Sequence, residues 1–212
     1  MSKRKKIILG TAVLAALAFL LTAFTQAAAH RRRPFHSGAV CAPLSIVVRE
    51  ERLADGRKNP MPALEDGDIL VTQCTHSFGW RHGHAALVVD AQAGQTLEAV
   101  TLGVPSGLGT VQSWQTYPSF AVLRPKSSDE ALGRNVARYA AEHLLDIPYR
   151  LTSGFFGEKS PAPPRGSQCA YLVWYAYAQF GYDLDGDGGR LVTVKDLLQS
   201  PLLKTVAQVG VP

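Results

Sequence analysis

Hydrophobic and polar residues along the chain follow two different periods. Between residues 65 and 125 they alternate in short runs that are separated by turn residues, a pattern typical of β-strands. We expect strands within four segments: 65–73, 84–91, 95–103 and 119–125. Their hairpin-like spacing predicts an antiparallel sheet.

A helical period begins after residue 126. Apolar residues recur at intervals of three and four, and they include Leu132, Val136, Tyr139 and Ala140. This spacing predicts a helix within 127–147, and Ser127 with Glu130 forms a capping-box pattern at its start.

A loop rich in glycine and proline follows, and a second helix is expected from about Gln168 to Phe180, with Gly181 in the usual terminating position. Strands followed by helices indicate an α+β fold, with an antiparallel sheet packed on helices.

The first 29 residues have the composition of a targeting segment. Four basic residues precede an apolar run over 7–24, which indicates a secretory signal or an uncleaved membrane anchor. Small residues at Ala27 and Ala29 fit a cleavage site and favour the signal, whereas the basic run 31–33 disfavours cleavage. We expect an exported protein, secreted or in the cell envelope, that can attach to a membrane through 7–24.

Residues 30–65 contain several prolines and a charged polar run, so we expect an irregular arm, or a short strand at 45–48, ahead of a main domain over 66–212. The net charge of +5 comes from the leader, because residues 1–33 hold seven of the 22 basic residues and leave 15 against 17 acidic ones. This balance argues against a nucleic-acid partner.

Three cysteines are an odd number for an exported chain. Cys41 and Cys74 could pair and leave Cys169 free; alternatively, Cys169 is a small buried hydrophobe or pairs with one of the others. Its place at a predicted helix start favours thiolate over thiol, because the helix dipole and unpaired N–H groups stabilise negative charge there.

Two residues of the predicted sheet could complete a nucleophilic site with Cys169. His84 begins an apolar strand, which is a rigid position for a base. Glu98 lies between apolar residues of the next strand, and a hairpin would let its carboxylate accept the second ring N–H of His84. The alternative for Glu98 is a solvent-facing position on an alternating strand.

The motifs, taken in order, resemble a known family. They are GDILVTQ, HAALVV, LEAVTLGV, Trp114, FAVLRP, IPYRLTSG, SQCAYLVWYAY and DLDGDGGRLVT. This series is similar to the circularly permuted NlpC/p60 cysteine hydrolases of the YiiX/YebB type, whose core is papain-like and whose histidine strand precedes the cysteine helix.

The resemblance implies that Cys169 is the nucleophile, His84 the base and Glu98 the orienting residue. It also implies that Tyr149 lines the cleft, and Trp80 and His82 are candidates for substrate contact from the loop 76–83. The implied reaction is hydrolysis of an amide, in the first instance of cell-wall peptide, through a thioester and without a required cofactor. Alternatives are a lipid or acyl ester hydrolase or an acyltransferase with the same three residues.

Two metal hypotheses remain open. Asp183, Asp185 and Asp187 precede a glycine as in a calcium loop, but the twelfth position is Val194, so Asp196 would have to substitute. A tight turn explains the same residues.

His82 and His84 are two residues apart and, with Cys169 or Glu98, could ligate zinc in a metal-binding or non-catalytic binding module.

Overall fold

The computed structural model describes residues 14–18, 34–45, 47–127, 129, 131–153, 159, 162 and 164–210. Most of the expected signal or anchor lies outside the described residues, although 14–18 are helical. No helix among the described residues has the length and apolarity required to span a membrane.

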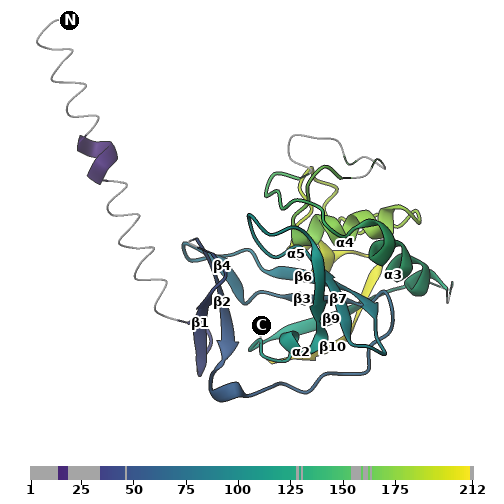
Figure 1. The fold of residues 1–212 in the computed structure, drawn as a ribbon, viewed down its shortest axis with the longest axis horizontal. Coiled ribbons are helices and arrows are strands. Elements are labelled where there is room, and N and C mark those ends of the chain that lie inside the picture. Colours follow the sequence, from purple (N-terminus) through teal and green to yellow (C-terminus); the bar gives the residue numbers. More distant parts are fainter. Residues whose placement is uncertain are drawn as a thin grey trace, which may run out of the picture.

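The strands form two antiparallel sheets, which are arranged side by side in Figure 1. The four-stranded sheet has the order β1-β2-β4-β5, with β1 Ala39–Pro43, β2 Val48–Leu53, β4 Thr75–Ser77 and β5 Trp80–Arg81. The six-stranded sheet has the order β10-β9-β3-β6-β7-β8, with β3 Ile69–Thr72, β6 His84–Asp90, β7 Gln95–Glu98, β8 Gly107–Thr110, β9 Phe120–Pro125 and β10 Leu203–Val209.

The predicted antiparallel sheet is confirmed by β3, β6, β7 and β9, which fall within the four expected segments. Two edge strands of this sheet were not predicted. The sequence of β8 is GLGT, which has too many glycines to resemble a strand, and β10 exposes several of its residues.

The helices are α2 Val111–Trp114, α3 Leu132–His143, α4 Cys169–Ala178 and α5 Val194–Gln199, and a 3₁₀ turn covers Ala54–Gly56. Helix α4 lies where the second helix was predicted. The capping-box prediction for the first helix is wrong, because α3 begins five residues after Ser127 and its N-cap Ala131 makes no side-chain capping bond. Glu130 lies outside the described residues.

Residues 30–65 are more regular than expected, because β1 and β2 pair with each other and β2 also pairs with β4. The charged sequence of β2 suggested a solvated arm, yet its two central residues, Glu50 and Glu51, are both buried. Arginine partners compensate these charges: Arg52 bonds to Glu50 and Arg81 to Glu51. The segment is therefore continuous with the fold from β4 onward.

The core lies on both faces of the six-stranded sheet. Ile69, Val71 and Leu87 belong to one cluster with α3, α4 and α5, whereas Leu70 and Ala86 face the opposite way and pack with Trp114. This division follows from the period-2 alternation of side chains along a strand. Figure 1 shows α3 and α4 together on one side of the sheet.

Helix α4 is apolar all round, and each of its residues from Cys169 to Tyr177 is buried. A helix of this kind is enclosed by its neighbours, here β6 on one side with α3 and α5 beside it. The start of α4 is thus held rigidly against the sheet.

Candidate active site

Cys169 is the first residue of α4. Its N-cap Gln168 is extended, and the side-chain carbonyl of Gln168 accepts a hydrogen bond from Ala170 N–H at 2.7 Å. The amide nitrogen of Gln168 donates to the carbonyl oxygen of Val192. Gln168 thereby fixes the entry of the chain into the helix and so the direction of the Cys169 side chain.

His84 and Glu98 lie on adjacent strands of the hairpin β6–β7. Ala86 is paired with Glu98 in this register, so His84 lies on the same sheet face, one diagonal position away. The His84 Nε2–H group donates to Glu98 Oε2 at 2.7 Å. The contact predicted from the hairpin is therefore present.

The second oxygen of Glu98 is also fully engaged. Oε1 accepts from the Thr96 hydroxyl at 2.6 Å and from the Trp114 indole N–H at 3.0 Å. The ring of Trp114 also stacks on that of His84, with 5.4 Å between centroids and 17° between planes. These contacts hold the carboxylate and the imidazole in a single relative orientation.

A glycine on β8 leaves the space that this carboxylate occupies. A Cβ atom on Gly109 would lie 2.3 Å from Glu98 Oε1 and 2.8 Å from Thr96 Oγ1. Any larger side chain at position 109 would collide with the Glu98 side chain.

The surroundings of His84 and Glu98 favour the charged forms of both side chains. Burial opposes ionisation of both groups, but it is outweighed in each case. Hydrogen bonds with Cys169 and Glu98 raise the pKa of His84 to about 10. The hydrogen bonds from His84, Thr96 and Trp114 lower the pKa of Glu98. Near neutral pH, His84 is therefore an imidazolium between a carboxylate and the sulfur of Cys169.

A cavity of about 470 Å³ opens at Cys169. Its described lining is mostly apolar and contains no Lys, Arg, Asp or Glu side chain. The aromatic and aliphatic lining residues are Val47, Val48, Phe78, Trp80, Leu102, Tyr149, Leu151, Leu191, Val192 and Val194.

The three predicted substrate-contact residues Tyr149, Trp80 and His82 all line this cavity. Tyr149 is positioned by a parallel bridge to Ser167, just before α4. Burial, together with the nearby Cys169 sulfur, raises the pKa of Tyr149, so its hydroxyl stays protonated. Trp80 is largely exposed at the rim. Phe155 and Phe156, in the loop sequence before α4, lie outside the described residues.

A second cavity of about 280 Å³ lies behind the His84–Glu98 pair. Its lining includes Glu50, Arg52 and Tyr117. Arg52 donates to Glu50 at 2.7 Å and lies over the Tyr117 ring, and the Tyr117 hydroxyl also donates to Glu50. The N-terminal strand β2 thus contributes directly to the surroundings of the pair.

The zinc hypothesis for His82 and His84 assumed that both residues lie on one strand face. The strand is interrupted between them, because Gly83 has φ +75°, and a Cβ there would lie 2.6 Å from Thr72 O. His82 instead faces Gly83 O and the Ser77 hydroxyl, at 3.0 and 3.1 Å. Burial, partly opposed by the bond to Gly83, lowers the pKa of His82.

The aspartate loop after α4 forms a series of side-chain-to-backbone turns. Asp183, Asp185 and Asp187 each accept from the backbone N–H two residues later. Asp196 belongs to the capping box of α5, where its carboxylate accepts from Thr193 N–H and Oγ1–H at 2.7 Å. Carboxylate oxygens of Asp185, Asp187 and Asp196 lie within 4.8 Å of one another, and Asp183 is not part of this group. It accepts the indole N–H of Trp174 instead.

All three cysteines are free thiols, so Cys41 and Cys74 do not pair. Cys74 is fully buried and contacts Ser119, whereas Cys41 faces His76, with 4.0 Å between sulfur and Nε2. The odd cysteine count is thus resolved without a disulfide.

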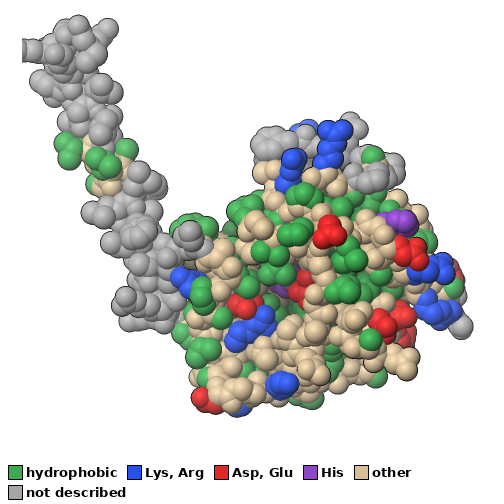
Figure 2. All heavy atoms as spheres, in the orientation of Figure 1, with side chains coloured by type: hydrophobic (Ala, Val, Ile, Leu, Met, Phe, Trp, Pro, Cys, Tyr) green, Lys and Arg blue, Asp and Glu red, His purple; other side chains and the backbone are tan. Residues whose placement is uncertain are grey.

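Charged groups on the molecular face in Figure 2 are mixed. Over the part of this face that the structure describes, Lys and Arg side chains lie in small separate groups among acidic and apolar ones.

The strand with the histidine precedes the helix with the cysteine, and the antiparallel sheet packs on that helix. This is the order of elements that the resemblance stated from the sequence implied. The chain matches the solved structure of the metalloprotein YiiX from Escherichia coli O157:H7 with a TM-score of 0.51 and 18% sequence identity. The match covers 70% of this chain and 99% of that one, and it is a likeness of fold. No family model and no curated protein matches the sequence.

Proposed function

We propose that the protein is a cysteine hydrolase that cleaves an amide or ester bond through a thioester intermediate. The observation that carries the proposal is the buried hydrogen-bonded series from Trp114 and Thr96 through Glu98 to His84 and on to Cys169. A nucleophile beside a base that a third group orients is the arrangement required for covalent catalysis.

The reaction begins with an ion pair. Glu98 accepts from His84 Nε2–H, and Nδ1 holds the proton taken from Cys169, so that the sulfur reacts as the thiolate. The thiolate attacks the acyl carbon of the substrate, and His84 donates its proton to the leaving nitrogen or oxygen as that bond breaks.

Water then hydrolyses the thioester. His84 accepts a proton from the attacking water, the C–S bond breaks, and the acid product leaves Cys169 as a thiolate. The backbone N–H of Cys169 has no hydrogen-bond partner among the described residues, and it would donate to the oxyanion in both steps.

The composition of the cavity bears on the substrate. A cell-wall peptide, the substrate first expected from the resemblance, carries carboxylate groups, for which the described lining supplies no charged partner. An apolar acyl group suits the aliphatic and aromatic walls better. We therefore place an acyl ester or acyl amide ahead of the cell-wall peptide as the substrate class.

The YiiX structure is that of a metalloprotein. In the hydrolysis proposed here, each bond change and proton transfer is assigned to Cys169, His84 and Glu98. The expected export of the protein would place this activity outside the cytoplasm.

The test uses the full chain with two substrate panels: muropeptides, and acyl esters of increasing chain length. Because each buried methylene contributes about 0.8 kcal/mol, we expect kcat/KM to rise by up to about fourfold per methylene until the cavity is filled. A preference for muropeptides would support the cell-wall alternative and reject the acyl one.

Matched variants test the chemistry. Cys169→Ala should abolish turnover and labelling by an acyl probe, and His84→Gln should lower kcat by roughly 10²- to 10⁴-fold. Cys41→Ser, a thiol remote from the cavity lining, should leave both unchanged. Turnover that persists in Cys169→Ala would refute the proposal.

A further inference from the structure

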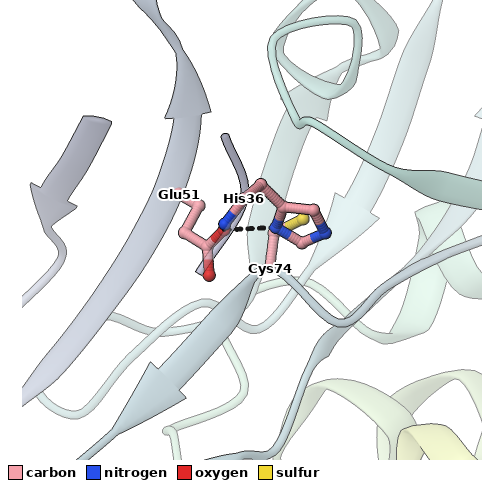
Figure 3. Close-up of side chains that lie close together, drawn as sticks. All are labelled: His36, Glu51 and Cys74. Atoms are coloured by element: carbon pink, nitrogen blue, oxygen red, sulfur yellow. Dashed lines mark hydrogen bonds and ion pairs between the residues drawn. The ribbon is translucent and has the colours of Figure 1, made fainter. Parts of the chain in front are cut away.

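A second group of chemically active side chains lies apart from the proposed active site. It consists of His36, before β1, Glu51, on β2, and Cys74, in the turn between β3 and β4 (Figure 3). One donor atom from each, a ring nitrogen, a carboxylate oxygen and a sulfur, lies within 4.8 Å of the other two. Three segments that are distant in sequence thus direct ligand-type atoms at one point.

The environment of this group is closed. Glu51 and Cys74 have no exposed surface, and the His36 side chain is 17% exposed. A carboxylate without access to water must be compensated by charge or by hydrogen bonds. Figure 3 shows the Glu51 carboxylate directed at the His36 ring, and the two form a hydrogen bond between Oε2 and Nδ1.

The two oxygens of Glu51 have different partners. Oε1 accepts from Arg81 NH2 at 2.8 Å, whereas Oε2 accepts from the backbone N–H of His36 at 3.0 Å and faces its ring. Among the described residues, the Cys74 sulfur bonds only to Ser119, in contacts of 3.5 Å. Arg81 NH2 also contacts His36 Nδ1 at 3.3 Å, so Arg81 fixes both the carboxylate and the ring beside the Cys74 sulfur.

We propose that His36, Glu51 and Cys74 bind a zinc ion. Imidazole nitrogen, carboxylate oxygen and thiolate sulfur are the three ligand types that zinc prefers, at about 2.0–2.3 Å from the ion. Donor atoms of a tetrahedral site are then roughly 3.3–3.8 Å apart, so the hydrogen-bonded His36 Nδ1 and Glu51 Oε2 would have to move apart to admit the ion, while all three donors already lie within 4.8 Å of one another. Cys74 binds as the thiolate and His36 through a deprotonated Nδ1, so the thiol proton and the Nδ1 proton that bonds to Glu51 both pass to solvent.

The surroundings supply the remaining parts of a metal site. The bond from Arg81 to Oε1 is the kind of outer contact that fixes a ligating carboxylate. His76 is the nearest further donor for a fourth position, since its Nε2 lies 3.9 Å from Glu51 Oε1 and its side chain is buried.

The position of the ion indicates a structural role. It would join the segment before β1 to β2 and to the β3–β4 turn, where the backbone of Glu51 already bonds to Cys74 O at 2.8 Å. Strands β4 and β5 continue from this turn and, with the residues that follow, contribute Ser77, Phe78, Trp80 and His82 to the wall of the large cavity. Zinc would thus brace the wall of the cavity without contact with the substrate.

The experiment measures zinc directly in the full chain, after removal of metal with a chelator under reducing conditions and titration with zinc chloride. We expect one zinc ion per chain and a rise in melting temperature of roughly 5–10 °C at a hundredfold excess over Kd. Cobalt in place of zinc should give a thiolate-to-metal charge-transfer band.

Variants assign the site. Cys74→Ser should remove the cobalt band, and His36→Gln, a change at a partly exposed position, should weaken zinc binding more than about 100-fold, beyond the loss typical of outer contacts. Cys41→Ser and Asp187→Asn are controls that should retain both signals. Circular dichroism establishes that each variant is folded.

Three results would overturn the assignment. They are an absence of stoichiometric zinc in the folded wild-type chain, zinc binding unchanged in His36→Gln, and a cobalt band that disappears in Cys169→Ala but persists in Cys74→Ser. The last result would move the metal to the catalytic cysteine.

Discussion

The replacement Glu98→Gln tests whether the carboxylate sets the protonation of His84. Glutamine has nearly the same size, and its one side-chain oxygen can still accept from His84 Nε2–H. Its NH2 group then replaces Oε1 and cannot accept from Trp114, so the change removes the negative charge together with that bond. The imidazolium then loses its ionic partner, and the pKa of His84 must fall from its value of about 10.

The size of the fall follows from the hydrogen bond that changes. A bond to a charged acceptor is worth about 1.5–3 kcal/mol and a neutral one about 0.5–1.5 kcal/mol, a difference of about 1–2 kcal/mol. At 1.36 kcal/mol per unit, the pKa of His84 should fall by about one unit. It should stay above neutral, because the hydrogen bond with Cys169 also raises it.

The assay is the pH titration of the His84 ring nitrogens by NMR, with the pH profile of kcat/KM measured alongside. The alkaline limb of the profile should move down with the His84 pKa. As a control, Thr96→Val removes a neutral donor to Glu98 Oε1 and leaves the charge in place, so it should not lower the pKa of His84. An unchanged His84 titration in Glu98→Gln would show that the carboxylate does not hold the imidazolium.

Three further predictions concern packing, pH and capping. Gly109→Ala should displace the Glu98 carboxylate, because the added Cβ would lie 2.3 Å from Glu98 Oε1. We expect kcat to fall roughly 10- to 100-fold while circular dichroism shows an unchanged fold. A variant with the wild-type kcat would show that the added methyl group does not displace the carboxylate. Because the pKa of His84 is raised in the folded state, the contribution of the charged ring to stability is complete below about pH 6.5 and is lost as pH rises through about 10. The free energies of unfolding in urea of wild type and His84→Gln should therefore differ most at low pH. A difference that does not change with pH would refute the raised pKa. Thr193→Ala should cost about 1 kcal/mol of unfolding free energy through loss of the α5 capping box, with Thr193→Ser as the control that retains it.

The central strands and α4 could be predicted because their residues are buried in one consistent pattern. Strands β3, β6 and β9 are hydrophobic runs between turns, and α4 is apolar throughout. The pairing of His84 with Glu98 was accessible for the same reason: a carboxylate inside an apolar strand needs a partner, and a tight hairpin limits where that partner can be.

Parts of the site could not be found in this way. Thr96 lies two residues before Glu98 on the same strand face, so the strand period is sufficient to suggest that these two residues interact. The bond from Trp114 to Glu98, in contrast, requires α2 to return over the sheet. Gln168 acts through Val192, which follows it by 24 residues, and no local pattern connects the two. Such contacts depend on the three-dimensional path of the chain.

The segment 30–65 shows why charge patterns mislead at buried strands. A run with glutamates and arginines is typical of a solvated surface, yet adjacent residues of a strand point to opposite faces, so the two glutamates of β2 have different environments. Glu50 lines the cavity behind His84 and Glu98, bonded to Arg52 and Tyr117.

Glu51, one residue further along β2, points the other way, toward His36 and Cys74. Strand β2, in the segment expected to be an irregular arm, therefore contributes to both candidate sites. The apolar neighbours of Glu98 in the sequence indicate that its carboxylate is buried. A buried carboxylate within a charged run needs a partner just as much, but its sequence neighbours do not indicate that it is buried. The burial of Glu51 and the zinc site proposed for it are thus visible only once β2 is paired with β1 and β4.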